Sequence, residues 1–393
     1  MMTYNFDQLN DRRNSYSMKW DIKDNELPMW VADMDFQTVP AVTDAIQKRA
    51  KQGIFGYTII PDDWREVYCG WWKRRHNLTI APESLVFCTG VVPALSSIVR
   101  KMTTVGENVL VQTPVYNIFF NSIRNNGRNI LESRLVYENG TYHIDWADLE
   151  AKLSNPQTTL MFLCNPQNPI GHIWERETLA KIGELCHKHH VLVVSDEIHC
   201  DLTDPGKEYV PFASVSEICA QNSITCMAPT KTFNIAGLQT AAVMIPNPVI
   251  RQKVDRGLNT DEVAEPNVFA IEAVLAAFRY GDQWLDELRE YIYENKQLVW
   301  DFIKKELPDV HVIISDSTYL LWLDCSAYES DSEKLEELIR EKTGLWLCAG
   351  KEYGGEPDGF LRMNIACPRS RVMDGLERLK RALEEIWKNQ SFR

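Results

Sequence analysis

The feature of this sequence that most constrains its fold is a series of six short apolar runs between residues 85 and 247. They occupy residues 85–88, 108–112, 160–164, 191–195, 224–227 and 241–245, and segments with helical character separate them. A strand exposed on one face alternates polar and apolar residues, whereas a strand covered on both faces is apolar along its whole length. The runs therefore predict an α/β fold with a mainly parallel sheet that helices cover on both faces.

The length of the chain, 393 residues, is too great for one compact core and favours two domains. A segment rich in Glu, Lys and Leu, from about residue 266 to 305, could bridge them as a helix. After it, residues 310–314 and 320–323 have strand character, and an amphipathic helix ends near Trp387. The expected divisions are an N-terminal arm that joins the small domain (1–47), a large domain (48–284) and a C-terminal small α+β domain (285–393).

Charge and cysteine content exclude several classes of partner. The net charge of −13 argues against nucleic acid and against an anionic membrane surface. No apolar run reaches about 18 residues, and the N-terminal MMTYNFDQLNDRRNSYS lacks the apolar core of a signal peptide. The ten cysteines form no CxxC pair, and several lie inside apolar runs, which indicates free thiols in a reducing compartment. We expect a cytoplasmic protein with no nucleic-acid or membrane partner.

Two loops that follow predicted strands have the composition of ligand-binding turns. Ligands in open α/β sheets bind outside the carboxyl ends of the strands. Gly90 follows the first run and opens a helix at Val91 and Val92, whose free N–H groups could bind a phosphate. Residues 165–171 (NPQNPIG) form a rigid turn that would present Asn168 as a fixed hydrogen-bonding group. Taken alone, the glycine loop is better interpreted as an ordinary strand-to-helix connection.

Three further loops carry a charged residue at or near a strand end. Asp196 ends a buried strand, where a carboxylate is costly unless it meets a cation, although it could instead cap the next element. Lys231 lies in APTKTFNIAG, almost free of other charges, which would disfavour its charged form and make it a better nucleophile and base. A surface lysine is the alternative, and it is the commoner one for any single Lys. Arg362 follows a strand-like segment near the C-terminus and alone would be a surface arginine.

Taken together and in this order, these loops resemble those of the aminotransferase class I/II superfamily of pyridoxal-phosphate enzymes. That family has a glycine phosphate loop, an aromatic residue, an NPxNP turn, an acidic strand end, a lysine and a C-terminal arginine. The matching positions here are Gly90, Tyr116, residues 165–169, Asp196, Lys231 and Arg362. The resemblance covers nearly the whole chain and implies a large cofactor-binding domain with a mainly parallel seven-stranded sheet.

A finer resemblance is to the cystathionine β-lyase, or cysteine-S-conjugate β-lyase, branch of that superfamily. The segments that carry it are KWD at 19–21, MWVADMDF at 29–36, FGY at 55–57, DEIH at 196–199 and KTFNIAGLQ at 231–239. The WVADMDF and DEIH segments are typical of the branch rather than of the superfamily. The alternative is an aminotransferase that shares the same ancestral segments.

The resemblance implies a role for each residue around the cofactor ring. Lys231 would bond covalently to pyridoxal phosphate and then move the proton from the substrate Cα. Asp196 would keep the pyridine nitrogen protonated, which keeps the ring an electron sink. Tyr116 would stack on the ring, and Asn168 would bond its hydroxyl. His199 occupies the position at which typical aminotransferases carry a tyrosine.

The same resemblance implies a phosphate site, a substrate site and a homodimer. Tyr57 would act catalytically from the neighbouring subunit by reaching its phosphate. Arg362 would bind the substrate α-carboxylate through two hydrogen bonds, with Asn168 and Trp30 also against the substrate. The residues expected to face the phosphate within one chain are Gly90, Val91, Val92 and Thr230.

Two departures from the aminotransferase pattern bear on the reaction. Many aminotransferases place a hydroxyl three residues before the lysine and an arginine eight residues after it, but this chain has Ala228 and Gln239 there. His199 in place of tyrosine also changes how the ring oxygen is stabilised. Both departures agree with the lyase branch and count against efficient transamination.

The sequence therefore predicts a homodimeric lyase that cleaves the Cβ–S bond of L-cystathionine or another L-cysteine S-conjugate. The products would be a thiol, pyruvate and ammonia. One alternative is an aminotransferase for an aromatic or histidinol-phosphate-like amine. A second, from another class, is a binding protein or partner of a transcription regulator that keeps the cofactor for folding. A helix-turn-helix or a basic patch would favour that second alternative, and neither is evident in the sequence.

Overall fold

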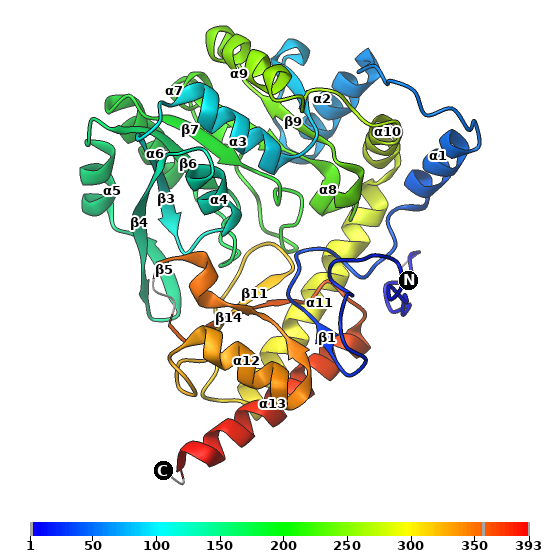
Figure 1. Cartoon of the computed structure of the whole chain (residues 1–393), viewed down its shortest axis with the longest axis vertical. Coiled ribbons are helices and arrows are strands. Elements are labelled where there is room, and N and C mark those ends of the chain that lie inside the picture. The colour runs from blue at the N-terminus through cyan, green and yellow to red at the C-terminus, as the bar shows by residue number, and fades with distance from the viewer. Residues whose placement is uncertain (1–2, 356–357, 392–393) are drawn as a thin grey trace.

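The computed structural model describes residues 3–355 and 358–391, and its largest element is an eight-stranded sheet (Figure 1). The strand order is β2-β9-β8-β7-β6-β3-β4-β5. The five strands from β8 to β4 are parallel, while β9 and β5 run antiparallel to their neighbours. The strands are β2 (Leu85–Cys88), β3 (Asn108–Thr113), β4 (Asn129–Glu138), β5 (Thr141–Ile144), β6 (Thr158–Cys164), β7 (Leu192–Asp196), β8 (Ser223–Met227) and β9 (Ala241–Met244). All six apolar runs are strands of this sheet, as predicted.

The sheet has one strand more than the seven that the resemblance implies. After β4, Asn139 and Gly140 both have positive φ, 52° and 78°, which is the conformation of a two-residue hairpin turn. The chain therefore reverses and adds β5 antiparallel to β4 at the edge of the sheet. An Asn-Gly pair between two β-rich segments is the sequence signal for such a hairpin, and the strand prediction missed it.

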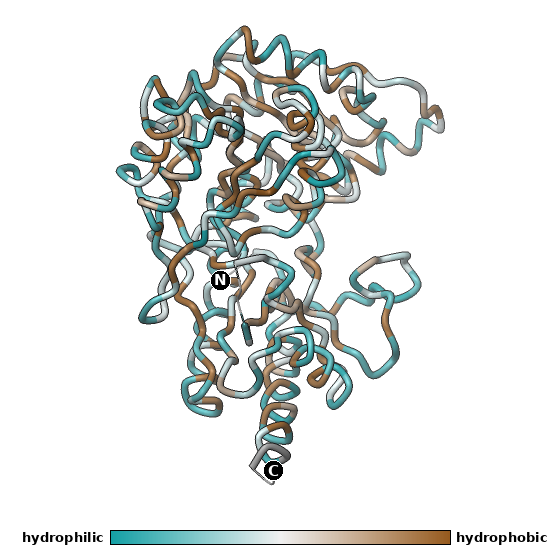
Figure 2. Tube along the Cα trace, turned by 60° about the vertical axis from the view of Figure 1, so that its left-hand side comes forward, coloured by the Kyte–Doolittle hydropathy of each residue, from teal (hydrophilic) through white to brown (hydrophobic). Residues whose placement is uncertain are grey.

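Helices cover both faces of the sheet, because alternate residues of each strand point to opposite sides. Val109 and Val111 pack in a core beneath α3, α4 and α9, whereas Leu110 between them packs with α5 and α6 on the other face. Figure 2 shows the hydrophobic stretches running through the middle of the upper body. The helices of this body are α1 (Pro40–Ala50), α2 (Asp62–His76), α3 (Val91–Met102), α4 (Ile118–Arg124), α5 (Trp146–Leu153), α6 (Arg176–Lys188), α7 (Glu217–Gln221), α8 (Pro229–Thr232), α9 (Pro248–Thr260) and α10 (Ala270–Tyr280).

A second, smaller body is built from the C-terminal part of the chain (Figure 1). Its antiparallel sheet has the order β10-β11-β14-β13, formed by His311–Val312, Leu320–Asp324, Phe360–Asn364 and Cys348–Ala349. Helices α12 (Ser332–Thr343) and α13 (Arg369–Ser391) pack against each other beside it. The N-terminal segment joins this body, because β1 (Leu27–Pro28) pairs in parallel with β12 (Leu345–Trp346).

The segment that sequence analysis treated as one bridging helix is two helices. α10 ends at Tyr280, and α11 (Asp282–Glu306) then runs from the large body to the small one (Figure 1). Gly281 separates them, and a side chain there would collide with the ring of Phe233 and the carbonyl of Ala277. The close approach of Phe233 therefore requires a glycine at the junction.

The cysteines have the burial that their positions inside apolar runs indicated. All ten cysteines are free thiols, and every one except Cys69 is buried. Within residues 3–355 and 358–391, no helix combines the length and apolar character that a bilayer crossing requires.

Candidate active site

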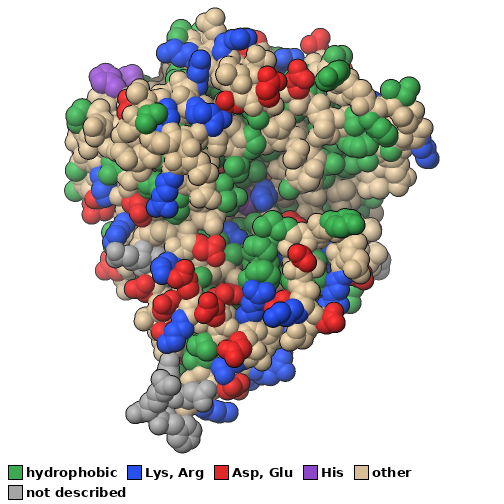
Figure 3. All heavy atoms as spheres, viewed as in Figure 1, with side chains coloured by type: hydrophobic (Ala, Val, Ile, Leu, Met, Phe, Trp, Pro, Cys, Tyr) green, Lys and Arg blue, Asp and Glu red, His purple; other side chains and the backbone are tan. Residues whose placement is uncertain are grey.

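A cavity of about 270 Å³ lies at the carboxyl ends of the parallel strands and brings together nine of the residues singled out from the sequence. The surface between the two bodies is hollowed, with hydrophobic side chains at its margins (Figure 3). The predicted residues that line the cavity are Gly90, Val91, Val92, Tyr116, Asn168, Asp196, His199, Thr230 and Lys231. They come from five separate segments of the chain and meet because parallel strands end at one edge of the sheet.

Lys231 lies in the single helical turn α8, shortly after β8, and its half-buried side chain lines the cavity. Nζ donates a hydrogen bond to the carbonyl of Ala32 at 2.5 Å. Burial, helped by the charge of Arg362 and opposed by those of Asp33 and Asp196, lowers the pKa of the amine to about 8. About a tenth of this amine is therefore unprotonated at pH 7, far more than for an ordinary lysine with a pKa of about 10.4, and the unprotonated form is the one that acts as a nucleophile or base.

Asp196 and Glu197 are adjacent buried acids with different surroundings. The Glu197 carboxylate accepts hydrogen bonds from Ser195 Oγ, Tyr209 Oη and Phe212 N. Asp196 lines the cavity and accepts one from Ile198 N at 3.2 Å. Burial raises the pKa of Asp196 to about 7, despite that hydrogen bond and the nearby Lys231. A cation bound against Asp196, such as a protonated pyridine nitrogen, would offset the cost of burying its charge.

His199 presents an orphaned polar atom in the same cavity. Its Nδ1 is buried without a hydrogen-bond partner in the described chain. Burial, helped by the charges of Lys231 and Arg362, lowers the pKa of the imidazole to about 3, so the ring is neutral. Asn168 is held nearby by a turn that Gln167 anchors, since Gln167 Nε2 donates to the carbonyls of Gln112 and Pro114. An unpartnered ring nitrogen and a fixed amide fit a ligand that carries a ring oxygen.

The opposite end of the cavity is suited to a phosphate. Helix α3 begins at Val91, directly after the extended Gly90, and its first residues line the cavity. The N–H groups of this first turn have no partner within the helix and can therefore bind a phosphate. A Cβ on Gly90 would lie 3.3 Å from Cδ of Pro93, which is closer than such contacts normally come. Gln239 and Thr240 also line this cavity, although sequence analysis noted Gln239 only as a missing arginine.

Arg362 is buried on β14 and its guanidinium is only partly satisfied. Nη2 donates to the carbonyl of Trp30 at 2.8 Å, and Nη1 donates to Oδ1 of Asn168 at 3.3 Å. Nε is buried without a hydrogen-bond partner in the described chain. A buried guanidinium with a spare donor fits a carboxylate ligand.

Trp30, Tyr57 and Arg362 are not among the residues that line the cavity of their own chain, although Arg362 hydrogen-bonds to Asn168, which does line it. The Trp30 ring stacks on Trp346 with the ring centroids 4.5 Å apart, and it is the Trp30 carbonyl that contacts Arg362. Tyr57 is fully exposed, in a segment without helix or strand. Ile54 and Ile59 are also exposed in that segment.

Tyr319 and Ala32 lie beside Lys231, and the sequence did not assign a role to either of them. Tyr319 is fully buried, and its hydroxyl donates to the carbonyl of Ala32, the same carbonyl that Lys231 contacts. Ala32 lies inside the WVADMDF segment, so that segment could have indicated a residue of the site. No local pattern marks Tyr319.

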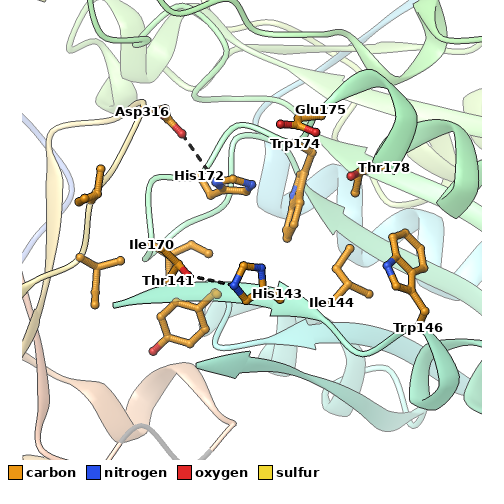
Figure 4. Close-up of a pocket in the computed structure, with 13 residues that line it drawn as sticks. Thr141, His143, Ile144, Trp146, Ile170, His172, Trp174, Glu175, Thr178 and Asp316 are labelled. Atoms are coloured by element: carbon orange, nitrogen blue, oxygen red, sulfur yellow. Dashed lines mark hydrogen bonds and ion pairs between the residues drawn. The ribbon is translucent and has the colours of Figure 1, made fainter. Parts of the chain in front are cut away.

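A second cavity, of about 440 Å³, lies beside β5 (Figure 4). His172 Nδ1 lies 3.6 Å from Asp316 Oδ2, and Thr141 Oγ1 lies 3.0 Å from His143 Nε2. Trp174 stands against His172 with the ring centroids 4.8 Å apart. This cavity shares no lining residue with the one that holds Lys231.

The fold and the first cavity together define a class of protein. An aldehyde cofactor needs an amine that is partly unprotonated, and Lys231 provides one in the same cavity as Asp196, which forms no ion pair within the described residues. The helix N-terminus supplies a phosphate site, so the residues present fit pyridoxal phosphate. The class is that of pyridoxal-phosphate-dependent enzymes.

Comparison with known proteins identifies the family. The family model for aminotransferase class I and II matches residues 26–379. Cystathionine beta-lyase PatB from Bacillus subtilis (strain 168) is 45% identical over 386 residues, spanning 96% of this chain and 100% of that protein. Cystalysin from Treponema denticola, whose crystal structure contains pyridoxal 5'-phosphate, matches with a TM-score of 0.94 and 32% identity, covering 98% of this chain and 100% of cystalysin. The pyridoxal-phosphate-bound C–S lyase from Staphylococcus hominis matches with a TM-score of 0.91 and 32% identity, covering 97% and 98%.

The chain belongs to the aminotransferase class I and II family. It is a pyridoxal-phosphate-dependent carbon–sulfur lyase, as predicted from the sequence, and the predicted α/β fold is confirmed.

Proposed function

We propose that this lyase β-eliminates L-cystathionine or another L-cysteine S-conjugate, releasing a thiol, pyruvate and ammonia. The observation that carries the proposal is the amine of Lys231, which lines the same cavity as Asp196 and has a pKa lowered to about 8. A base of that pKa is suited to removing a Cα proton near neutral pH. The relative from Bacillus subtilis, named as a cystathionine beta-lyase, supports the same choice of substrate.

Arg362 and Lys231 would have different roles in the reaction. When bound, pyridoxal phosphate supplies an electron sink for the pair left on Cα after the proton is removed. Arg362 would bind the α-carboxylate and so orient the substrate, and Lys231 would take the Cα proton. The thiolate then leaves from Cβ with little assistance because it is a stable anion, and the three-carbon fragment hydrolyses to pyruvate and ammonia.

The cofactor-binding roles are part of this proposal. Asp196 would pair with the protonated ring nitrogen, and Tyr116 would stack on the ring. Asn168 and His199 would face the ring oxygen. The phosphate would be bound by Gly90, Val91, Val92 and Thr230, with Gln239 as a further donor in the place of the missing arginine.

A coupled assay distinguishes elimination from transamination. We expect purified protein to release pyruvate and thiol from L-cystathionine at a rate that does not depend on added 2-oxoglutarate. L-Alanine, which has no β-leaving group, should exchange its α-proton with solvent without net product. Rapid amination of keto acids, with cystathionine left intact, would contradict the lyase and favour the aminotransferase.

We also propose a cytoplasmic homodimer in which Tyr57 completes the partner's site. The exposed apolar residues Ile54 and Ile59 around Tyr57 support a protein contact there, since such patches mark interaction surfaces. Ten unpaired thiols support a reducing compartment.

Mixing two impaired variants tests the shared site. Tyr57→Phe keeps Lys231, and Lys231→Ala keeps Tyr57, so a hybrid dimer has one intact site and one doubly impaired site. After the subunits are exchanged, we expect up to about a quarter of wild-type activity, because half of randomly formed dimers are hybrids. Each variant remixed with itself is the control. An active monomer in sedimentation experiments would exclude the shared site.

A further inference from the structure

The WVADMDF segment, residues 30–36, forms an irregular strap whose carbonyls are all held by side chains from elsewhere. It contains no helix or strand. Asn364 Nδ2 donates to the carbonyls of residues 31 and 33, and Asn234 Nδ2 donates to those of residues 34 and 36. Arg362 holds the carbonyl of residue 30, and Asn10 holds that of residue 35. A backbone segment tied at each residue presents fixed acceptors.

The remaining carbonyl of the strap, that of Ala32, faces the catalytic lysine. It accepts hydrogen bonds from Lys231 Nζ at 2.5 Å and from Tyr319 Oη at 3.1 Å. A carbonyl oxygen has two lone pairs, so these two donors fill it. The phenol of Tyr319 also stands edge-on to the His199 imidazole, with the ring centroids 6.1 Å apart.

We propose that the Ala32 carbonyl is the docking acceptor for the free amine of Lys231, and that Tyr319 is the positioning residue that fixes this contact. The proposal rests on the proposed function, because in the holoenzyme the amine of Lys231 is free only after a substrate amine has displaced it. The strap also holds Arg362 two residues away, through the Trp30 carbonyl. One backbone segment thus sets the distance between the carboxylate-binding guanidinium and the base.

The Tyr319 hydroxyl has a predictable effect on the amine. The charged groups that face Nζ are Arg362, Asp33 and Asp196, and the nearby His199 is neutral. The Tyr319 hydroxyl and the Lys231 ammonium compete for the Ala32 carbonyl. The hydroxyl also points its partly positive hydrogen at that carbonyl, which weakens the field that stabilises the ammonium. Removing the hydroxyl should therefore strengthen the remaining hydrogen bond and raise the pKa of Lys231. Loosening the carbonyl itself should have the opposite effect, because the ammonium then loses its acceptor.

The experiment uses the full-length holoenzyme and the same chain after cofactor removal. Tyr319→Phe deletes the competing hydroxyl, and Asn364→Ala frees the strap on both sides of Ala32. Tyr68→Phe is the matched control, because Tyr68 is also fully buried and its hydroxyl has no hydrogen-bond partner in the described chain. The pKa of Lys231 is measured in the cofactor-free chain by differential acylation of its peptide, and in the holoenzyme from the pH profile of kcat.

For Tyr319→Phe, we expect kcat with cystathionine to fall about tenfold and KM to stay within about twofold, as for the loss of one neutral hydrogen bond that acts after substrate binding. In Tyr319→Phe, the pKa of Lys231 should rise by about half a unit, both in the holoenzyme and in the cofactor-free chain. The same pKa should fall in Asn364→Ala and stay unchanged in Tyr68→Phe.

Three results would overturn the proposal: no change in kcat or pKa, a change in KM alone, or a loss of kcat that follows thermal stability without a pKa shift. If Asn364→Ala does not fold, the kcat and the Lys231 pKa of Tyr319→Phe are sufficient to test the proposal. If the wild type releases no pyruvate from cystathionine, the proposed function fails, while the acylation measurement still tests the contact.

Discussion

Lys231→Ala is expected to bind pyridoxal phosphate only loosely and to lose turnover by at least about four orders of magnitude. The effect is this large because one amine both attaches the cofactor and moves the Cα proton. Its pKa, lowered to about 8 by burial, suits it to both tasks, and no other lysine lines the cavity among the described residues.

Borohydride reduction provides the measurement beside the loss of turnover. In the wild type it should fix the cofactor to one peptide that contains Lys231, and in Lys231→Ala it should fix none. Lys48→Ala, an exposed position on α1, is the control and should behave as wild type. A small primary amine added to Lys231→Ala should restore part of the α-proton exchange by occupying the vacated space. Full activity in a preparation free of cofactor would refute the assignment.

Asp196→Asn has the second largest expected effect and should lower kcat by about 10²-fold or more while KM changes little. The amide is nearly the same size as the carboxyl but cannot balance a protonated ring nitrogen, so the electron sink is weakened. Arg362→Ala is the informative contrast, because it should raise KM for every substrate through the loss of the shared carboxylate contact. An Asp196→Asn enzyme with unchanged kcat would show that the ring nitrogen is not paired there.

The same substitution should have the opposite effect on the stability of the cofactor-free chain. Burial raises the pKa of Asp196 from 3.8 to about 7, so the folded state binds the proton more tightly than the unfolded state. The stability that this proton provides is fully present below about pH 4 and is lost as the pH rises toward 7. Cofactor-free wild type should therefore melt below cofactor-free Asp196→Asn at pH 8, and the gap should close at pH 4. Addition of pyridoxal phosphate should reverse the order at pH 8, because its ring nitrogen supplies the missing cation.

The sequence by itself determined the sheet and most of the cavity. Strands buried on both faces are apolar throughout, so the six runs could be recognised without knowing their partners. Since the carboxyl ends of parallel strands meet at one edge, residues such as Gly90, Asp196 and Lys231 could be expected to lie together. The eighth strand was also readable, because Asn139–Gly140 is a local turn signal.

Only the tertiary structure decided which groups contact these side chains. Trp30 was expected to lie against the substrate, and the structure shows in addition that its carbonyl accepts a hydrogen bond from Arg362 while its ring stacks on Trp346. The acceptor for Lys231 is a backbone carbonyl 199 residues away, shared with Tyr319 from the small body. Every residue has a carbonyl, so no side-chain pattern marks the one that is used. Apolar periodicity is a local property that burial imposes on each strand, whereas these hydrogen bonds exist only once the two bodies have packed around the strap.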